Sequence, residues 1–214
     1  LGAIASIAPY TDPRAIDLVS ASVIAAVGAA VALVGIIAFK ALHPFLRRRM
    51  PNPLLLSLAG GLILGGLGAL GGPLTLFKGL EQSAQLVALN GSIGWASLLA
   101  IVGIKLAALV VAASFGFRGG RVFPAIFLGV AFGMVAHALV PSIPFGLALA
   151  GGVLGFTLAI ARDGWIALFV AVAMVSDIGI LPIMCVAILP TWLVVARAPE
   201  MIIEDHQPAA VTTS

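Results

Sequence analysis

Residues 114–133 read SFGFRGGRVFPAIFLGVAFG, a break in an otherwise apolar chain. A glycine pair and two arginines, Arg118 and Arg121, interrupt the apolar residues, and Pro124 follows at once. Proline is tolerated in the first turn of a helix, because its missing N–H would have no partner there. The stretch therefore predicts a helix that begins near Val122, directly after a non-helical glycine turn.

The predicted helix start has two interpretations. At membrane depth, its unpaired N–H groups and the positive end of its dipole would favour an anion, and broken helices within a bilayer are typical of transport sites. In a water-exposed loop between two spans, Arg118 and Arg121 would simply be solvated. The motif alone favours neither interpretation, so the composition of the whole chain has to decide.

The composition is that of an integral membrane protein. Of 214 residues, 62% are hydrophobic and 9% are charged, whereas soluble domains carry roughly a quarter charged residues. The mean hydropathy is +1.22. In lipid, every backbone polar group needs an internal partner, and long apolar runs without period-two alternation favour helices over a barrel. The net charge of +3 comes from a few residues at the edges of apolar runs, which indicates membrane topology and no nucleic-acid partner.

Apolar segments along the chain predict an all-α, multi-pass fold. Residues 19–39 form the clearest span, because 21 helical residues cross a hydrocarbon core of about 30 Å. Residues 73–94 are more polar and predict a short helix or a re-entrant piece. The other apolar segments are 54–70, 95–113, 122–140, 145–160, 165–175 and 178–195. Several are too short to span untilted, and short, tilted, re-entrant broken helices are typical of transporters and channels.

The domain organisation follows from these segments. Residues 1–196 are predicted to form one transmembrane domain, and residues 197–214 a polar tail that we expect to be disordered. Asp163 and Ser176 are predicted to cap the helices that follow them. We expect a missing amino-terminal portion before Leu1.

The densest positive cluster indicates orientation. Arg47, Arg48 and Arg49 follow the first span closely. Because positive residues beside spans favour the cytoplasmic side, we expect these arginines to lie in a cytoplasmic loop of a protein in the inner (plasma) membrane.

Polar residues elsewhere carry weaker signals. Lys105 lies inside a span and is expected to face water or a partner, or to snorkel. Glu81 could be a proton carrier or gate, but an exposed or Lys78-paired residue is the more frequent case. Residues 66–71 match G-x-G-x-x-G, yet they fall within an apolar helix rather than a βαβ unit, so close helix packing explains them better. No catalytic or metal-binding set is visible, and we expect no enzyme activity, cofactor or metal.

The segment order and the run GGRVFPAIFLGVAFG at residues 119–133 resemble the carboxy-terminal half of the chloride channel and chloride/proton antiporter family, in a divergent bacterial branch. The resemblance extends over about residues 19–195 and includes the runs AIARDGW and ILPIM. It implies transport of an inorganic anion, chloride or another halide, by a channel or a proton-coupled antiporter. Alternatives are a secondary transporter of another anion with a related fold and a non-transporting membrane scaffold.

The resemblance also implies a site. In that family a G-x-F-x-P stretch opens the helix whose N-terminus faces the central anion. Gly120 and Pro124 match its glycine and proline, which implies that Arg121 and Val122 turn their backbone N–H groups to the anion. We also expect Gly120 to need the conformational freedom of glycine. The implied anion-binding residues are Gly119, Gly120, Arg121, Val122, Phe123 and Pro124, with Arg118 as an electrostatic contributor.

The chain departs from the family pattern in three ways. Phenylalanine falls at Phe123 rather than at position 122. The late tyrosine of the family has no counterpart, because Tyr10 is the only tyrosine. The serine and glutamate motifs belong to the amino-terminal half of the family, so we expect that half of the same protein as a partner. The resemblance further implies a homodimer in the lipid bilayer, with contacts through residues 19–39 and 165–195.

Overall fold

The computed structural model describes residues 7, 10–11, 13–72, 75, 79–117 and 119–201. All regular structure within these residues is helical, as predicted. Arg118, Lys78 and residues 202–214 lie outside the described residues, and the predictions made for them remain predictions.

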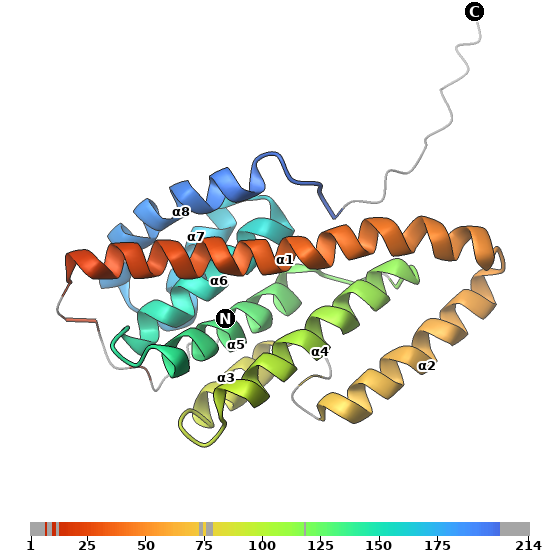
Figure 1. Ribbon diagram of the computed structural model, residues 1–214, viewed down its shortest axis with the longest axis horizontal. Coiled ribbons are helices and arrows are strands. Elements are labelled where there is room, and N and C mark those ends of the chain that lie inside the picture. Colours follow the sequence, from red (N-terminus) through yellow and green to blue (C-terminus); the bar gives the residue numbers. More distant parts are fainter. Residues whose placement is uncertain are drawn as a thin grey trace, which may run out of the picture.

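The helices follow one another with short connections (Figure 1). In chain order they are α1 (Ala15–Arg49), α2 (Pro53–Gly71), α3 (Leu80–Ala88), α4 (Trp95–Ser114), α5 (Val122–Leu139), α6 (Phe145–Ala161), α7 (Gly164–Val175), the 3-10 helix η2 (Ile178–Ile180) and α8 (Leu181–Val195). Helices α1, α2, α4 and α5 and the segment Ile178–Val195 are long and apolar enough to cross a membrane. Helices α3, α6 and α7 are shorter, which confirms the expected mixture of long and short helices.

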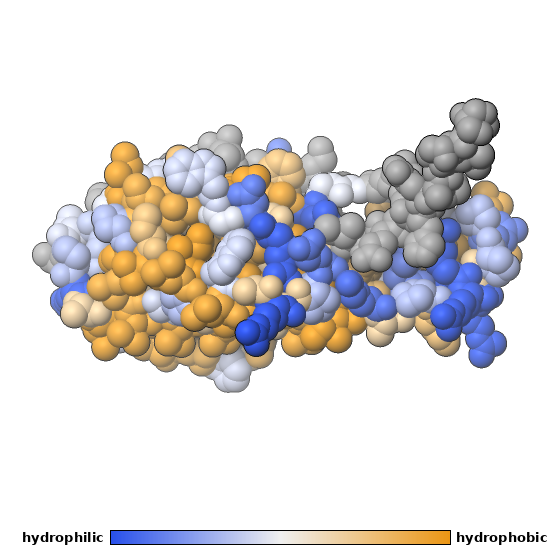
Figure 2. Space-filling model, turned by 90° about the horizontal axis from the view of Figure 1, so that it is seen from above, coloured by the Kyte–Doolittle hydropathy of each residue, from blue (hydrophilic) through white to orange (hydrophobic). Residues whose placement is uncertain are grey.

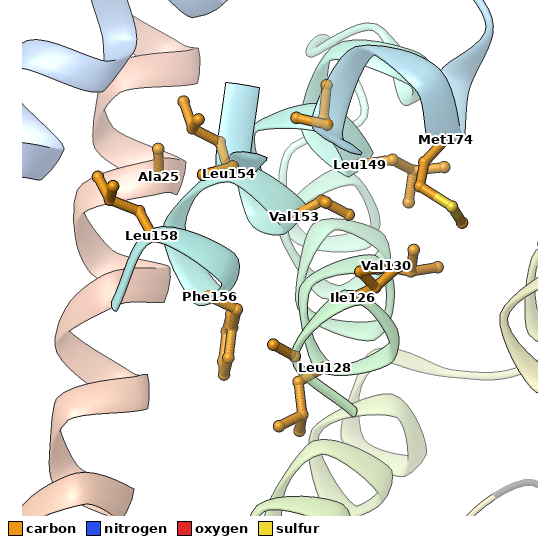
Figure 3. Close-up of a cluster of buried hydrophobic side chains, with 14 of the residues drawn as sticks. Ala25, Ile126, Leu128, Val130, Leu149, Val153, Leu154, Phe156, Leu158 and Met174 are labelled. Atoms are coloured by element: carbon orange, nitrogen blue, oxygen red, sulfur yellow. The ribbon is translucent and has the colours of Figure 1, made fainter. Parts of the chain in front are cut away.

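Helix α6 forms the centre of the fold. Every residue from Gly146 to Ile160 is buried, as expected for a helix that is apolar on all sides. Figure 3 shows Leu158 on the side of α6 facing Ala25 of α1, and Val153 on the side facing α5. A Cβ atom on Gly155 would collide with the backbone carbonyl of Ala25. The small residues therefore allow the backbones of α1, α5 and α6 to approach closely.

Helix α1 is longer than the predicted first span. It continues through Pro44 to Arg49, so the prediction that the three arginines lie in a loop is wrong: they form the last helical turn. The His43 ring packs 5.5 Å from the Phe39 ring, and its Nδ1 donates to the carbonyl of Ser114 at 3.0 Å. The hydrogen bond from His43 to α4 supports the helix near the proline, and positive side chains are favourable at a helix C-terminus.

Of the two predicted N-caps near α7, one is confirmed and one is wrong. The Asp163 side chain accepts a hydrogen bond from Ile166 N at 2.9 Å, which confirms it as the N-cap of α7. Ser176 is instead the C-cap of α7, with a left-handed φ of 56°. The next carboxylate, Asp177, caps η2 and accepts from Gly179 N at 2.8 Å. The left-handed residue ends α7, and the cap of the following helix is therefore one residue later than predicted.

The outer surface is strongly apolar. Leu62 and Leu70 of α2 are 76% and 79% exposed, and Leu193 of α8 is 77% exposed. Figure 2 shows hydrophobic residues over much of one face, with hydrophilic residues across its middle and at the end where α1 meets α2. An apolar surface of this extent indicates contact with lipid or with further protein.

Candidate anion site

The approach to α5 begins with an ordered end of α4. Phe117 N donates to Ala112 O at 3.0 Å and Gly116 N donates to Ala113 O at 3.2 Å, the two bonds of a Schellman motif. Gly116 has a left-handed φ of 83°, which glycine adopts without steric cost. The chain leaves α4 there and turns back toward the interior of the helix assembly.

Helix α5 begins at Val122, as the glycine turn and the proline predicted. Its N-cap, Arg121, has φ −82° and ψ −22° and provides no side-chain cap. Ala125 N donates to Arg121 O at 3.3 Å. The N–H groups of Gly119, Gly120, Arg121, Val122 and Phe123 have no acceptor within the part of the chain that the structure describes. The first turn of α5 contains no acidic residue, so nothing there opposes an anion at the dipole's positive end.

The start of α5 lies about halfway along the length of α1 (Figure 1). The apolar part of α1 is long enough to cross a membrane, and the start of α5 lies level with it in this view. The interpretation of residues 114–133 as a broken helix at membrane depth stays a prediction.

Three elements surround this start. A Cβ atom at Gly79, next to α3, would lie 2.8 Å from Phe127 Cβ, and Gly79 has a left-handed φ of 94°, so glycine is required there. A Cβ atom at Gly60 of α2 would lie 2.7 Å from Phe115 Cβ. Between α2, α4 and the start of α5 is a cavity of about 260 Å³, and its lining includes Thr75, Lys105 and Pro124.

The predicted site residues occupy one accessible segment. Gly119, Gly120, Arg121 and Phe123 are exposed, and Val122 and Pro124 are half-buried; Arg118 lies outside the described residues. The expectation that Gly120 needs glycine's conformational freedom is wrong. Its φ is outside the left-handed region, and a Cβ atom there would meet no described atom within 4 Å. The left-handed glycine of this turn is Gly116, four residues earlier.

Lys105 is the residue that sequence reasoning did not assign to this region. It is buried in α4, and its Nζ donates to Thr75 O at 2.8 Å. The available signal was a lysine inside an apolar span, but the sequence could not show which partner it meets. Glu81, by contrast, lies exposed on α3.

Tyr10 is remote from the predicted site. Together with His137 and Phe145, it lines a separate cavity of about 340 Å³ near the C-terminal end of α5. Its hydroxyl donates to the Asp17 carboxylate at 2.5 Å. Burial, with this hydrogen bond adding to it, raises the pKa of Tyr10 to about 12. Tyr10 therefore does not replace the late tyrosine of the family.

Comparisons with known proteins agree with this architecture. Residues 3–195 match the family model described as "Voltage gated chloride channel", and the chain belongs to that family. Two proteins described as "Putative ion-transport protein YfeO", from Salmonella schwarzengrund (strain CVM19633) and Salmonella newport (strain SL254), are 43% identical over 94% of this chain and 49% of their own length. The crystal structure of a CLC-type fluoride/proton antiporter matches with a TM-score of 0.71 at 20% identity, covering 91% of this chain and 48% of that one.

The comparisons confirm the family, the all-helical membrane fold and a class of channels and transporters rather than enzymes. The chain spans about half the length of the curated relatives that it matches.

Proposed function

We propose that this chain is the anion-binding half of a chloride channel-like transport protein, in which the N-terminus of α5 holds an inorganic anion, chloride or another halide. The observation that supports this most directly is the start of α5: backbone N–H groups without acceptors among the described residues, about halfway along α1. The family membership makes anion transport the expected use of such a terminus.

Backbone recognition suits transport because it balances binding against release. An anion at this depth has lost much of its water, and N–H dipoles replace part of the lost hydration. They do so without the strength of a direct ion pair, and conduction requires a site that the ion can also leave. Arg121 is exposed at the approach, where a positive side chain raises the local anion concentration. Arg118 has the same proposed role.

The complete pathway requires a second half in this proposal. The relatives are about twice as long as this chain, and an amino-terminal half of the same protein would close the site from the other side. A homodimer with one pathway per subunit would cover apolar side chains now exposed on α1, α7 and α8, such as Val34, Phe169 and Leu193. Crosslinking in membranes that yields only monomer would count against the dimer.

We expect Arg47, Arg48 and Arg49, and hence the turn from α1 to α2, to lie on the cytoplasmic side of the inner membrane. Positive residues at the end of a span favour that side. Single cysteines introduced at these positions should react with a membrane-impermeant thiol reagent only from the cytoplasm. Labelling from outside in intact cells would reverse the orientation.

An anion-flux assay tests the function itself. The full-length protein in liposomes should transport chloride or fluoride, and nitrate and a small carboxylate provide the comparison. Carboxylate flux without halide flux would replace this proposal with a transporter of organic anions. No flux of any of these ions, with the protein correctly folded, would favour a membrane scaffold.

A further inference from the structure

Lys105 is a buried charge in the middle of an apolar helix. Only 5% of its surface is exposed, and α4 is otherwise apolar enough to cross a membrane. A lysine at such a position is costly and is expected to face protein groups or a water-filled space. The groups that surround the ammonium therefore indicate the role of Lys105.

The ammonium group of Lys105 connects three parts of the fold. Its Nζ donates to Thr75 O at 2.8 Å, in the connection between α2 and α3. The same Nζ lies 5.2 Å from the centre of the Phe127 ring, in the second turn of α5. A cation over an aromatic face is attracted by the ring quadrupole. Lys105 thus links Thr75 to the first turns of α5.

The cavity beside these contacts reaches the first turn of α5 at Pro124. Lys105, Thr75 and Pro124 share its lining, and the other described lining residues are apolar or glycine, from α2 and α4. Among the described residues that line the cavity, Lys105 carries the only charge. A charge that is buried in protein is screened by solvent far less than an exposed one.

We infer that Lys105 is a positioning residue for the transported anion: it holds Thr75 against α5, and its positive charge strengthens anion binding at the α5 N-terminus. This inference rests on the proposed function of that terminus. Lys105 acts through the field and through the geometry of its neighbours, because its ammonium already donates to a backbone carbonyl. Its loss should therefore weaken anion affinity more than it slows the maximal rate.

The test separates the charge of the Lys105 side chain from its size, by measuring chloride transport of the full-length protein in liposomes. Lys105→Met removes the charge and keeps much of the length, whereas Lys105→Arg keeps the charge. For Lys105→Met we expect the KM for chloride to rise about tenfold, the effect of a unit charge that acts over a distance of about 12 Å at an effective dielectric constant of about 20, with the maximal rate within about twofold. Lys105→Arg should keep a KM near that of the unsubstituted protein.

A chemical variant keeps the test valid if Lys105→Met folds poorly. Lys105→Cys is made together with Cys185→Ser, because Cys185 is exposed. One folded preparation is then divided between an aminoethyl methanethiosulfonate, which restores a positive charge, and an ethyl methanethiosulfonate, which does not. Only the aminoethyl product should recover the low KM.

The outcomes separate the inference from the proposed function. Equal KM values for the aminoethyl and ethyl products, or a chloride KM unchanged in folded Lys105→Met, would overturn the inference while the unsubstituted protein still transports halide. No halide flux from the unsubstituted protein would overturn both.

Discussion

Replacement of Gly129 by alanine is expected to prevent normal packing of α5 against α6. A Cβ atom at Gly129 would lie 2.5 Å from Val153 Cα and 2.7 Å from Gly152 O. Both are backbone atoms of α6, so no side chain can rotate away, and the two helices would have to separate. Overpacking of a core costs about 1–3 kcal/mol and occasionally more. Since α6 is the buried centre of the fold, we expect Gly129→Ala to lower the free energy of unfolding by about 3 kcal/mol or more.

Gly65→Ala provides the matched control. Gly65 lies in α2, and a Cβ atom there meets no described atom within 4 Å. Alanine has the higher helix propensity by about 1 kcal/mol, so this variant should be as stable as the unsubstituted protein or slightly more so. The measurement is the monodisperse fraction and melting temperature of both variants in detergent. Equal stability of the two would show that the close crossing of α5 and α6 is not required.

Removal of the Val122 N–H is expected to weaken halide binding more than removal of the Arg121 side chain. Replacing Val122 with its α-hydroxy acid analogue converts the amide to an ester, which deletes the donor and leaves the side chain unchanged. Hydrogen bonds to charged groups contribute about 1.5–3 kcal/mol, so the ester should bind halide roughly 10–100-fold more weakly. Arg121 is exposed, and exposed charge pairs contribute about 0.2–1 kcal/mol. Arg121→Ala should therefore lower the halide affinity at most about fivefold.

The helices and the start of α5 were predictable because they depend on local chemistry. Apolar length predicts the spans, and a glycine turn followed by proline predicts where α5 begins. These signals lie within single segments, and the structure agrees with them. The close helix packing expected for the glycines at residues 66–71 is not seen at Gly66, where a Cβ atom would meet no described atom within 4 Å.

The failures concern features that depend on distant segments. Helix α1 passes Pro44 with support from α4, where His43 contacts Ser114. Lys105 meets Thr75, 30 residues earlier in the chain. The turn before α5 takes its left-handed residue at Gly116 rather than Gly120. Hydrophobic pattern and local propensity contain no information about which distant segment will supply a carbonyl or a packing partner.

Calorimetric titration of halide into the full-length protein tests most directly whether backbone N–H groups at the start of α5 bind the anion. The ester variant at Val122 and Arg121→Ala are compared with the unsubstituted protein, and size exclusion verifies that each is folded. We expect the halide affinity of the ester variant to fall about tenfold or more, and we expect Arg121→Ala to retain a halide site. Abolished binding in well-folded Arg121→Ala, together with normal binding by the ester variant, would contradict it and make the arginine side chain the ligand.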